Sequence, residues 1–166
     1  ISAKQGETFY DIGREYGIGY DAMEHANQGV DGLYLREGEQ VLLPTRFILP
    51  DAPREGIVIN LPEMRLYYYP PNSNVVHVFA IGIGREGWGT PKGILSIAEK
   101  RANPTWTPPA SIRAEHAANG DPLPAVVPAG PDNPLGLFAM RLSNPSYLLH
   151  GTNKPEGVGM RVSHGC

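Results

Sequence analysis

Residues 150–166, at the end of the sequence, carry the side chains best suited to covalent chemistry. They include His150, His164 and Cys166, which are two of the five histidines and the only cysteine of the chain. A cysteine supported by a histidine can act as a nucleophile, because the imidazole takes the thiol proton and the thiolate attacks a carbonyl carbon. An inert buried cysteine and a zinc ligand set are the alternatives, but the chain has no C-x-x-C or H-E-x-x-H pattern. The residues therefore favour nucleophilic catalysis.

The composition is that of a folded protein. The 166 residues are 41% hydrophobic and 19% charged, which suits one medium domain or a small domain joined to a larger one. The 20 glycines and 17 prolines predict many turns and few long helices. The net charge of −3, without a block of basic residues, argues against a nucleic-acid partner. No apolar run is long enough to span a membrane.

The two ends of the chain suggest a piece of a longer protein. The sequence starts at Ile1 without a methionine or a visible signal peptide, so we expect a trimmed piece of a precursor. Few proteins end on their nucleophile, and we therefore expect residues beyond Cys166. The single cysteine excludes an internal disulfide and leaves the redox compartment open.

Residues 1–45 have the pattern of a small unit made of a strand, two helices and a strand. Thr8 is the expected N-cap of the first helix, with Asp11 in an acidic capping box and Gly17 as the stop signal. Asp21 is expected to cap the second helix. The four elements are expected at residues 1–4, 9–16, 21–26 and 35–43.

This unit resembles a LysM domain, a family that binds N-acetylglucosamine-containing glycans. The resemblance rests on Gly6–Phe9, Ile12, Tyr16-Gly17, Asn27, Leu35, Gly38-Glu39 and Val41–Pro44. It implies a shallow glycan groove between the loop after the first strand and the loop after the second helix. A small helical cap that only packs on its neighbour is the alternative. The implied glycan-binding residues are Gly6, Thr8, Phe9, Asn27, Gly29 and Val30.

Residues 46–55 have two prolines and four charges and are expected to form a linker. From Gly56 onwards the pattern is that of β-structure. In the run 75–81, both alternating sets of side chains are mostly apolar, so both faces of a strand here would be buried. This pattern predicts a central strand. No helix is expected between residues 56 and 150. Strands are expected at residues 57–59, 65–69, 75–81, 93–97, 137–142 and 147–150.

Residues 101–136 contain eight prolines and are too long for an ordinary connection. Trp106 and the charged stretch 113–116 suit a flap that covers a substrate. A surface excursion fixed by its prolines fits the same pattern, and both interpretations remain open.

The run 150–166 matches the signature of the YkuD-type L,D-transpeptidases, which is an HGT segment, a spacer with a glycine, and S-H-G-C. Residues 57–69 are similar to the opening hairpin of that family, and residues 89–93 are similar to its T-P-x-G turn. The resemblance covers residues 56–166. The family usually continues past its cysteine with a hydrophobic residue and an Arg or Asn, and this sequence shows neither.

The resemblance implies a role for each residue of the motif. Cys166 would be the nucleophile and His150 its base, oriented by the backbone carbonyl of Gly151. His164 would support the site and is the alternative base. The N–H groups of Gly165 and Cys166 are natural donors to an oxyanion. The implied catalytic residues are Cys166, His150, Gly151, His164, Gly165 and Ser163, and the implied substrate-binding residues are Thr152, Asn153, Gly159 and Trp106.

The predicted fold is mainly β, with a βααβ LysM domain at 1–45, a linker at 46–55 and a β-sandwich-like, C-terminally incomplete YkuD catalytic domain at 56–166. The implied function is that of a periplasmic L,D-transpeptidase. Its thiol would take an acyl group from a peptidoglycan stem peptide, release D-Ala, and form a cross-link or attach an envelope lipoprotein. A hydrolase of the same fold and a non-catalytic peptidoglycan-binding protein are the alternatives. The resemblance implies no metal and no cofactor, and it implies acylation of the thiol by carbapenems.

Overall fold

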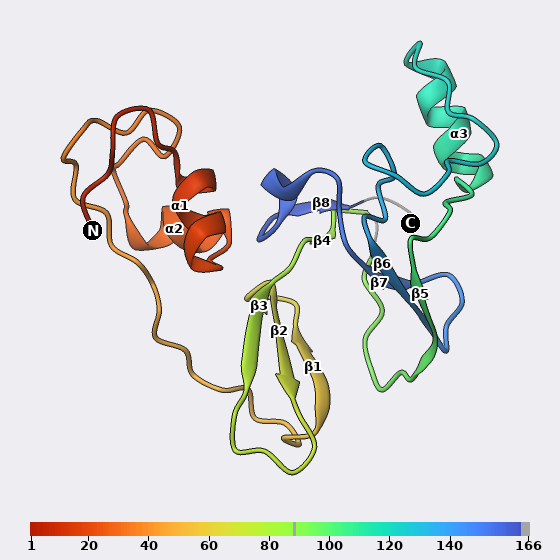
Figure 1. Ribbon diagram of the computed structural model, residues 1–166, viewed down its shortest axis with the longest axis horizontal. Coiled ribbons are helices and arrows are strands. Elements are labelled where there is room, and N and C mark those ends of the chain that lie inside the picture. The colour runs from red at the N-terminus through yellow and green to blue at the C-terminus, as the bar shows by residue number, and fades with distance from the viewer. Residues whose placement is uncertain (88, 164–166) are drawn as a thin grey trace. The chain divides into compact units, whose positions relative to one another are not determined.

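The computed structural model describes residues 1–87 and 89–163 (Figure 1). In this part of the chain strands outnumber helices, and the fold is mainly β, as the sequence predicts. The chain forms two compact units. The first contains residues 1–83 with residues 156–162, and the second contains residues 84–155 with the stretch that begins at Ser163. The described residues include no helix that is both long and apolar enough to cross a membrane.

Two short helices lie near the N-terminus, and the first of them begins and ends at recognisable caps. Helix α1 (Phe9–Tyr16) starts at Thr8, where the Thr8 hydroxyl accepts from the Asp11 amide and an Asp11 carboxylate oxygen accepts from the Thr8 amide. It ends at Gly17, whose φ of 68° is the left-handed conformation that glycine adopts without strain. The predicted capping box and stop signal are therefore confirmed. Helix α2 (Tyr20–Ala26) has Gly19 as its N-cap, so the predicted cap at Asp21 is wrong.

The strands expected on either side of these helices are reduced to a single bridge between Ser2 and Gln40. The Ala3 amide donates to the Glu39 carbonyl at 2.9 Å, but the paired stretch is too short to form a ladder. Burial rather than strand pairing holds this region together. The buried side chains of its core are Ala3, Phe9, Ile12, Ile18, Tyr20, Met23, Leu35 and Val41.

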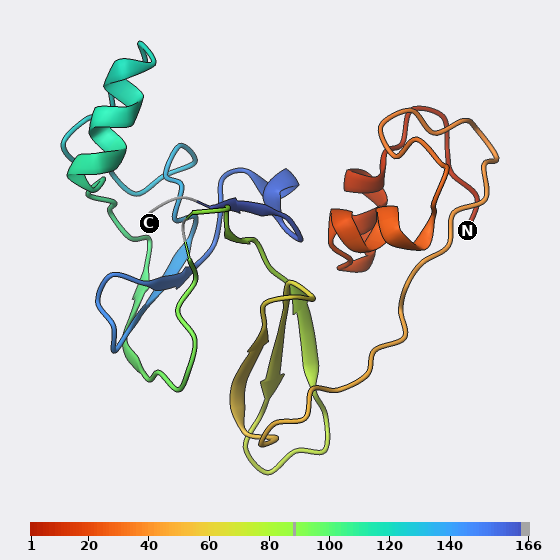
Figure 2. The same cartoon turned by 180° about the vertical axis from the view of Figure 1, so that it is seen from behind.

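The first sheet is antiparallel, with strands β1 (Gly56–Asn60), β2 (Arg65–Tyr69) and β3 (His77–Ala80) in the order β1-β2-β3 (Figure 2). The strands predicted at 57–59 and 65–69 are confirmed. The strand predicted at 75–81 is shorter than expected, and it lies at an edge of this sheet instead of its centre. The central strand is β2, whose Tyr67 and Tyr69 are buried, whereas Phe79 of β3 is half exposed.

A second antiparallel sheet has the order β5-β6-β7, with β5 at Ile97–Ala102, β6 at Phe138–Leu142 and β7 at Leu148–His150. The last two confirm the predicted strands, but the strand predicted at 93–97 is wrong. Gly93 has a φ of 103°, which is incompatible with an extended strand, and pairing starts only at Ile97. Strands β4 (Ile83–Gly84) and β8 (Arg161–Ser163) form a separate pair.

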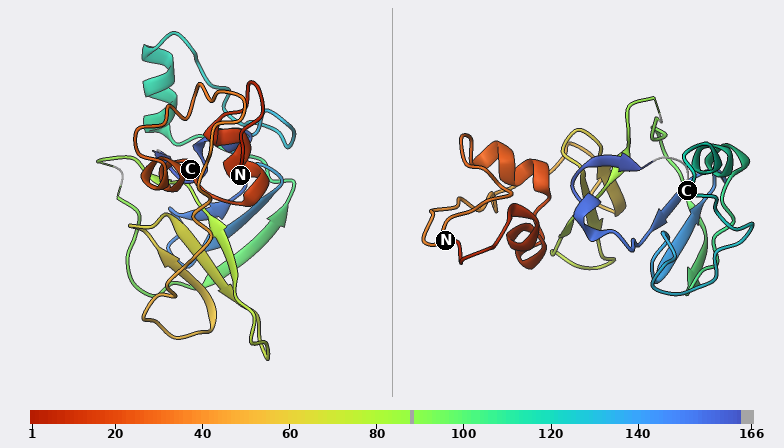
Figure 3. Two further views of the ribbon diagram at one scale, coloured as in Figure 1. Left: turned by 90° about the vertical axis from the view of Figure 1, so that its left-hand side faces the viewer. Right: turned by 90° about the horizontal axis from the view of Figure 1, so that it is seen from above.

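The proline-rich stretch 101–136 contains helix α3 (Ala110–Ala118), which the sequence analysis did not expect. The helix extends beyond one end of the second sheet (Figure 3). Pro109 precedes its first residue, a position where proline is tolerated because no amide hydrogen bond is lost. Alanines favour the helix, but Ile112 is its only buried residue, so the sequence shows almost no helical periodicity.

The stretch 101–136 packs around its own small core. Ile112 and Leu135 lie in this core with Trp106, and the Trp106 and Val127 backbones exchange two hydrogen bonds of 2.9 and 2.7 Å. The full set of buried residues in the core is Trp106, Ile112, Val127, Leu135 and Ala139.

Asn133 is fully buried beside this core and satisfies the backbone of three segments. Its Nδ2 donates to the carbonyl oxygens of Pro104 at 2.8 Å and Pro128 at 3.0 Å. Its Oδ1 accepts from the Leu135 amide at 2.9 Å. The proline-rich stretch is therefore held in place by hydrogen bonds among its own residues.

Candidate active site

His150, the expected base, is positioned by strand β7. His150 is the last residue of β7 and lies opposite Ala139 of β6. Just beyond the strand, the Gly151 amide donates to the Phe138 carbonyl at 2.9 Å, so the ladder continues one residue further. The backbone on both sides of His150 is therefore held by β6.

The imidazole of His150 has a defined tautomer. Its Nδ1 lies 2.6 Å from the carbonyl oxygen of Gly151, and because a carbonyl only accepts, Nδ1 carries the proton. Nε2 then has a free lone pair with which to accept a proton. The side chain is half-buried, and this burial lowers the pKa of His150 below its ordinary value, while the Gly151 carbonyl acts in the opposite direction. The ring is therefore neutral at pH 7, as a general base must be.

Two glycines pack backbone against backbone behind this histidine. A Cβ placed on Gly136, which has a φ of 65°, would lie 2.6 Å from the Thr152 nitrogen and 2.9 Å from the Gly151 carbonyl carbon. A Cβ on Gly151 would lie 3.2 Å from the Leu135 carbonyl oxygen. Sequence reasoning did not identify Gly136, because no local pattern shows that it meets a segment fifteen residues later in the chain.

The second half of the motif lies only partly within the described residues. A 3-10 turn (η1, Pro155–Gly157) leads through Gly159, which has a φ of 83°, into β8. The carbonyl of Ser163, the last described residue, accepts from the Arg85 amide at 2.8 Å. His164, Gly165 and Cys166 lie outside the described residues, so the nucleophile, the alternative base and the oxyanion donors stay predictions.

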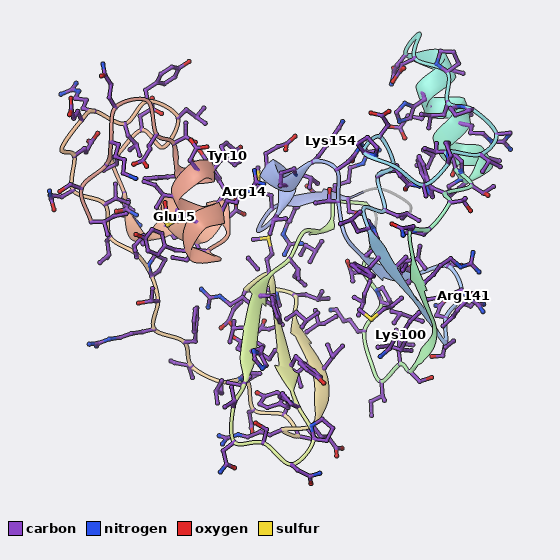
Figure 4. The ribbon with its side chains drawn as sticks, in the orientation of Figure 1. Tyr10, Arg14, Glu15, Lys100, Arg141 and Lys154 are labelled. Carbon is purple, nitrogen blue, oxygen red and sulfur yellow. The ribbon has the colours of Figure 1, made fainter. Side chains whose placement is uncertain are left out.

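The expected substrate-binding residues have different environments. Thr152 and Asn153 are exposed, and the Thr152 hydroxyl accepts from the Lys154 amide at 2.9 Å (Lys154 is labelled in Figure 4). Gly159 is buried. Trp106 is only 9% exposed and belongs to the core of the 101–136 stretch. Burial leaves little of the Trp106 ring for a ligand, so the structure gives it a packing role.

The expected glycan-binding residues also divide into two groups. Phe9 is fully buried, and Asn27 is buried with its amide bonded to the carbonyls of Met23 and Leu42. Both side chains are therefore committed to the core of the N-terminal region. Gly6 and Gly29 are exposed, with φ of 80° and 85°. Thr8 and Val30 are partly exposed, and the Thr8 side chain caps α1.

An ion pair that the sequence analysis missed joins the proline-rich stretch to the end of β4. The Arg85 guanidinium donates to Oε1 of Glu115 on α3 at 3.0 Å and to Oε2 at 3.3 Å. The charged stretch 113–116 was singled out from the sequence, but its partner lies thirty residues earlier and outside any motif. No group of three or more His, Cys, Asp or Glu side chains suited to a metal occurs within residues 1–87 and 89–163.

Known proteins are similar to this sequence over most or all of its length. The family model for YkuD, described as the L,D-transpeptidase catalytic domain, matches residues 54–166. The protein named "Probable L,D-transpeptidase YcfS" of Escherichia coli (strain K12) is 53% identical over all of this chain and 53% of its own length. "Probable L,D-transpeptidase YbiS" of the same strain is 52% identical over 92% of this chain and 50% of its own length. The chain thus spans about half the length of these curated relatives.

A solved structure shares the fold over most of the chain. It is titled "Crystal structure of a Probable carnitine operon oxidoreductase caia from Brucella melitensis" and is 29% identical, with a TM-score of 0.52. The match covers 71% of this chain and 74% of that chain. The similarity in sequence and the similarity in structure therefore both extend beyond the terminal motif.

Proposed function

We propose that this chain, which belongs to the YkuD family of L,D-transpeptidase catalytic domains, transfers acyl groups between peptidoglycan stem peptides through the thiol of Cys166. The names of its relatives support the reaction class. The observation that carries the proposal is the state of His150. Its proton lies on the nitrogen that faces Gly151, and its other nitrogen is free to accept the proton of a thiol.

The reaction proceeds in two balanced steps. The Cys166 thiolate attacks the carbonyl carbon of the third stem residue, a diamino acid, in the amide bond that joins this residue to the terminal D-Ala. A carbon–sulfur bond forms, the carbon–nitrogen bond breaks, and D-Ala leaves with the proton that His150 took from the thiol. An amine then attacks the thioester, transfers its proton to His150 and restores the thiolate. The acceptor amine belongs to a second stem peptide or to a lysine of an envelope lipoprotein. Passage through one covalent intermediate predicts ping-pong kinetics.

The N-terminal region is proposed to bind the glycan strand of the same polymer. Its exposed loops at Gly6 and Gly29 offer backbone groups to a sugar, while Phe9 and Asn27 fix those loops from the core. The Phe9 amide donates to the Gly32 carbonyl at 2.7 Å, which joins the two loops. A glycan-binding region raises the local concentration of the catalytic residues at a polymeric substrate. The proposed location is the periplasm, where a protein acting on peptidoglycan meets its substrate.

Product analysis tests the proposal. The full-length protein is incubated with purified tetrapeptide muropeptide, and the products are identified by mass. A new cross-linked dimer together with free D-Ala is the expected result. Trimmed monomer alone would identify a hydrolase of the same fold, in which water resolves the thioester.

A second measurement distinguishes the enzyme from a protein that only binds the cell wall. The intact mass after treatment with meropenem is expected to rise by one adduct, and the adduct is expected to disappear in Cys166→Ala. Binding to isolated cell walls without any adduct would contradict a catalytic thiol.

A further inference from the structure

The segment that precedes the nucleophile in the sequence belongs to the same compact unit as the N-terminal region. Residues 156–162 group with residues 1–83, whereas residues 84–155, including His150, form the other unit together with the stretch that begins at Ser163. Only two residues, His164 and Gly165, separate Ser163 from Cys166 in the sequence. The base and the segment that leads to the nucleophile therefore depend on different parts of the chain for support.

Met160 provides the side-chain part of this support. It is half-buried and packs against the core formed by Phe9, Ile12, Met23 and the other buried residues of the N-terminal region. Its sulfur lies 3.8 Å from the hydroxyl of Tyr10, which Figure 4 labels on α1. The Tyr10 ring in turn stacks on Tyr20, with centroids 4.2 Å apart. Methionine is a flexible side chain well suited to fill such an irregular apolar site.

A close backbone contact provides the second part. A Cβ on Gly159 would lie 2.2 Å from the Gly19 Cα, and a Cβ on Gly19 would lie 2.7 Å from the Gly159 Cα. Both glycines are buried. The two segments therefore approach as closely as two backbones can, and neither position has room for a side chain.

The other side of this segment is held by hydrogen bonds to the backbone around β4. The Ile83 amide donates to the Met160 carbonyl at 3.1 Å, and β4 pairs with β8 immediately afterwards. Residues 159–163 are thus fixed between the N-terminal region on one side and β4 on the other. A shift of Met160 is passed to strand β8 (Arg161–Ser163), which directly precedes His164, Gly165 and Cys166 in the sequence.

We propose that the N-terminal region is a positioning element of the acyl transfer, because Met160 and the Gly19–Gly159 contact hold the start of strand β8, which precedes Cys166 in the sequence. This inference rests on the proposed function only where it concerns the rate of acyl transfer. The contacts predict a change in thiol reactivity whether or not the thiol acts on a stem peptide. The N-terminal region then has a second task besides glycan binding, and Met160 is a positioning residue.

The main test compares two Met160 variants and one control variant of the full-length protein. Met160→Ala is expected to slow alkylation of Cys166 by iodoacetamide at pH 7 by about tenfold, because a thiol that has lost its base is only a few per cent ionised. It is also expected to lower kcat for the tetrapeptide by about 10–100-fold with KM within twofold. Met160→Leu conserves volume and is expected to restore both values. Tyr67→Leu leaves a void at a buried site of β2, outside the core that contacts Met160, and is expected to lower the melting temperature while leaving both rates unchanged.

A backbone variant tests the same idea with Met160 intact. Gly19 has a φ of −70°, so Gly19→Ala causes no backbone strain of its own, and its new methyl group conflicts with Gly159 alone. It is expected to slow alkylation by a factor similar to Met160→Ala. If Tyr67→Leu slows alkylation as much as Met160→Ala, the effect is general destabilisation and the inference fails.

The remaining outcomes separate this inference from the proposed function. If Cys166 of Met160→Ala is alkylated at the wild-type rate, the inference is overturned, even if the wild-type protein converts the tetrapeptide. If the wild type does not convert the tetrapeptide but Met160→Ala and Gly19→Ala still slow alkylation, the positioning role stands and the proposed function fails.

Discussion

Gly136→Ala is expected to damage the candidate base from a position outside every recognised motif. The new Cβ would lie 2.6 Å from the Thr152 nitrogen, whereas ordinary contacts begin near 3.4 Å, so this backbone must retreat by about 0.8 Å. Gly151, whose carbonyl carbon would lie 2.9 Å from the same methyl group, has to move with it. The carbonyl of Gly151 is the group that orients His150, at 2.6 Å from Nδ1. Since a displacement of about 1 Å in a catalytic group costs roughly 10²-fold in rate, we expect acylation to slow by about 10–100-fold.

The matched control is Gly120→Ala, in the same proline-rich stretch. Gly120 has a φ of 77°, close to the 65° of Gly136, and a Cβ there meets nothing within 4 Å. Both variants therefore carry the same cost of a left-handed alanine, about 1–2 kcal/mol, and only Gly136→Ala presses on the segment of His150.

The assay follows the mass of the full-length protein over time after addition of meropenem. The second-order rate constant of adduct formation is compared for the two variants and the wild type, with thermal unfolding measured in parallel. Gly120→Ala is expected to react at the wild-type rate. Equal rates in the two variants would refute the reasoning, because the contact behind Gly151 would then be irrelevant to the base.

Further predictions concern His150 and Asn133. The rate of acylation is expected to rise with pH through a pKa below the ordinary histidine value, because burial lowers the pKa of His150 and only its neutral ring accepts a proton. In His150→Ala, the rate of acylation measured from pH 5 to 8 is expected to be about 100-fold lower and to show no such rise with pH. An unchanged rate would move the base role to His164. Asn133→Ala is expected to lower the free energy of unfolding by about 2–4 kcal/mol, because it leaves buried backbone groups without partners. In Asn133→Asp a carboxylate would face carbonyl oxygens, which raises the pKa of the new side chain. This variant is therefore expected to be more stable at pH 4 than at pH 8, as measured by urea titration. Equal stability at the two pH values would contradict this account.

Local sequence signals determined much of the fold. Thr8 and Gly17 fixed the ends of α1, because a capping box and a left-handed glycine act within one helical turn. The strands at 65–69 and 137–142 were predicted because short runs rich in apolar and aromatic residues are typical of strands. The HGT and SHGC motifs likewise identified the family, since their residue types serve a reaction rather than a packing need.

Features that depend on long-range packing could not be predicted from the sequence. Helix α3 was missed because its single buried residue, Ile112, leaves no periodicity to read. The edge position of β3 depends on which neighbours the folded chain supplies, and its own alternation does not contain that information. Trp106 was taken for a substrate contact because a tryptophan in a loop looks the same in sequence whether it is exposed or buried.

The sequence by itself determined what chemistry this chain can perform, because the imidazole and the thiol are properties of single residues. The tertiary structure alone decided the state of the base and the support of the strand that leads to the nucleophile. The tautomer of His150 depends on the direction of one carbonyl, and that direction depends on a glycine fifteen residues before it. The placement of Met160 depends on a core built from the first 41 residues of the chain. Such contacts join segments that are distant in the sequence, and they exist only after the chain has folded.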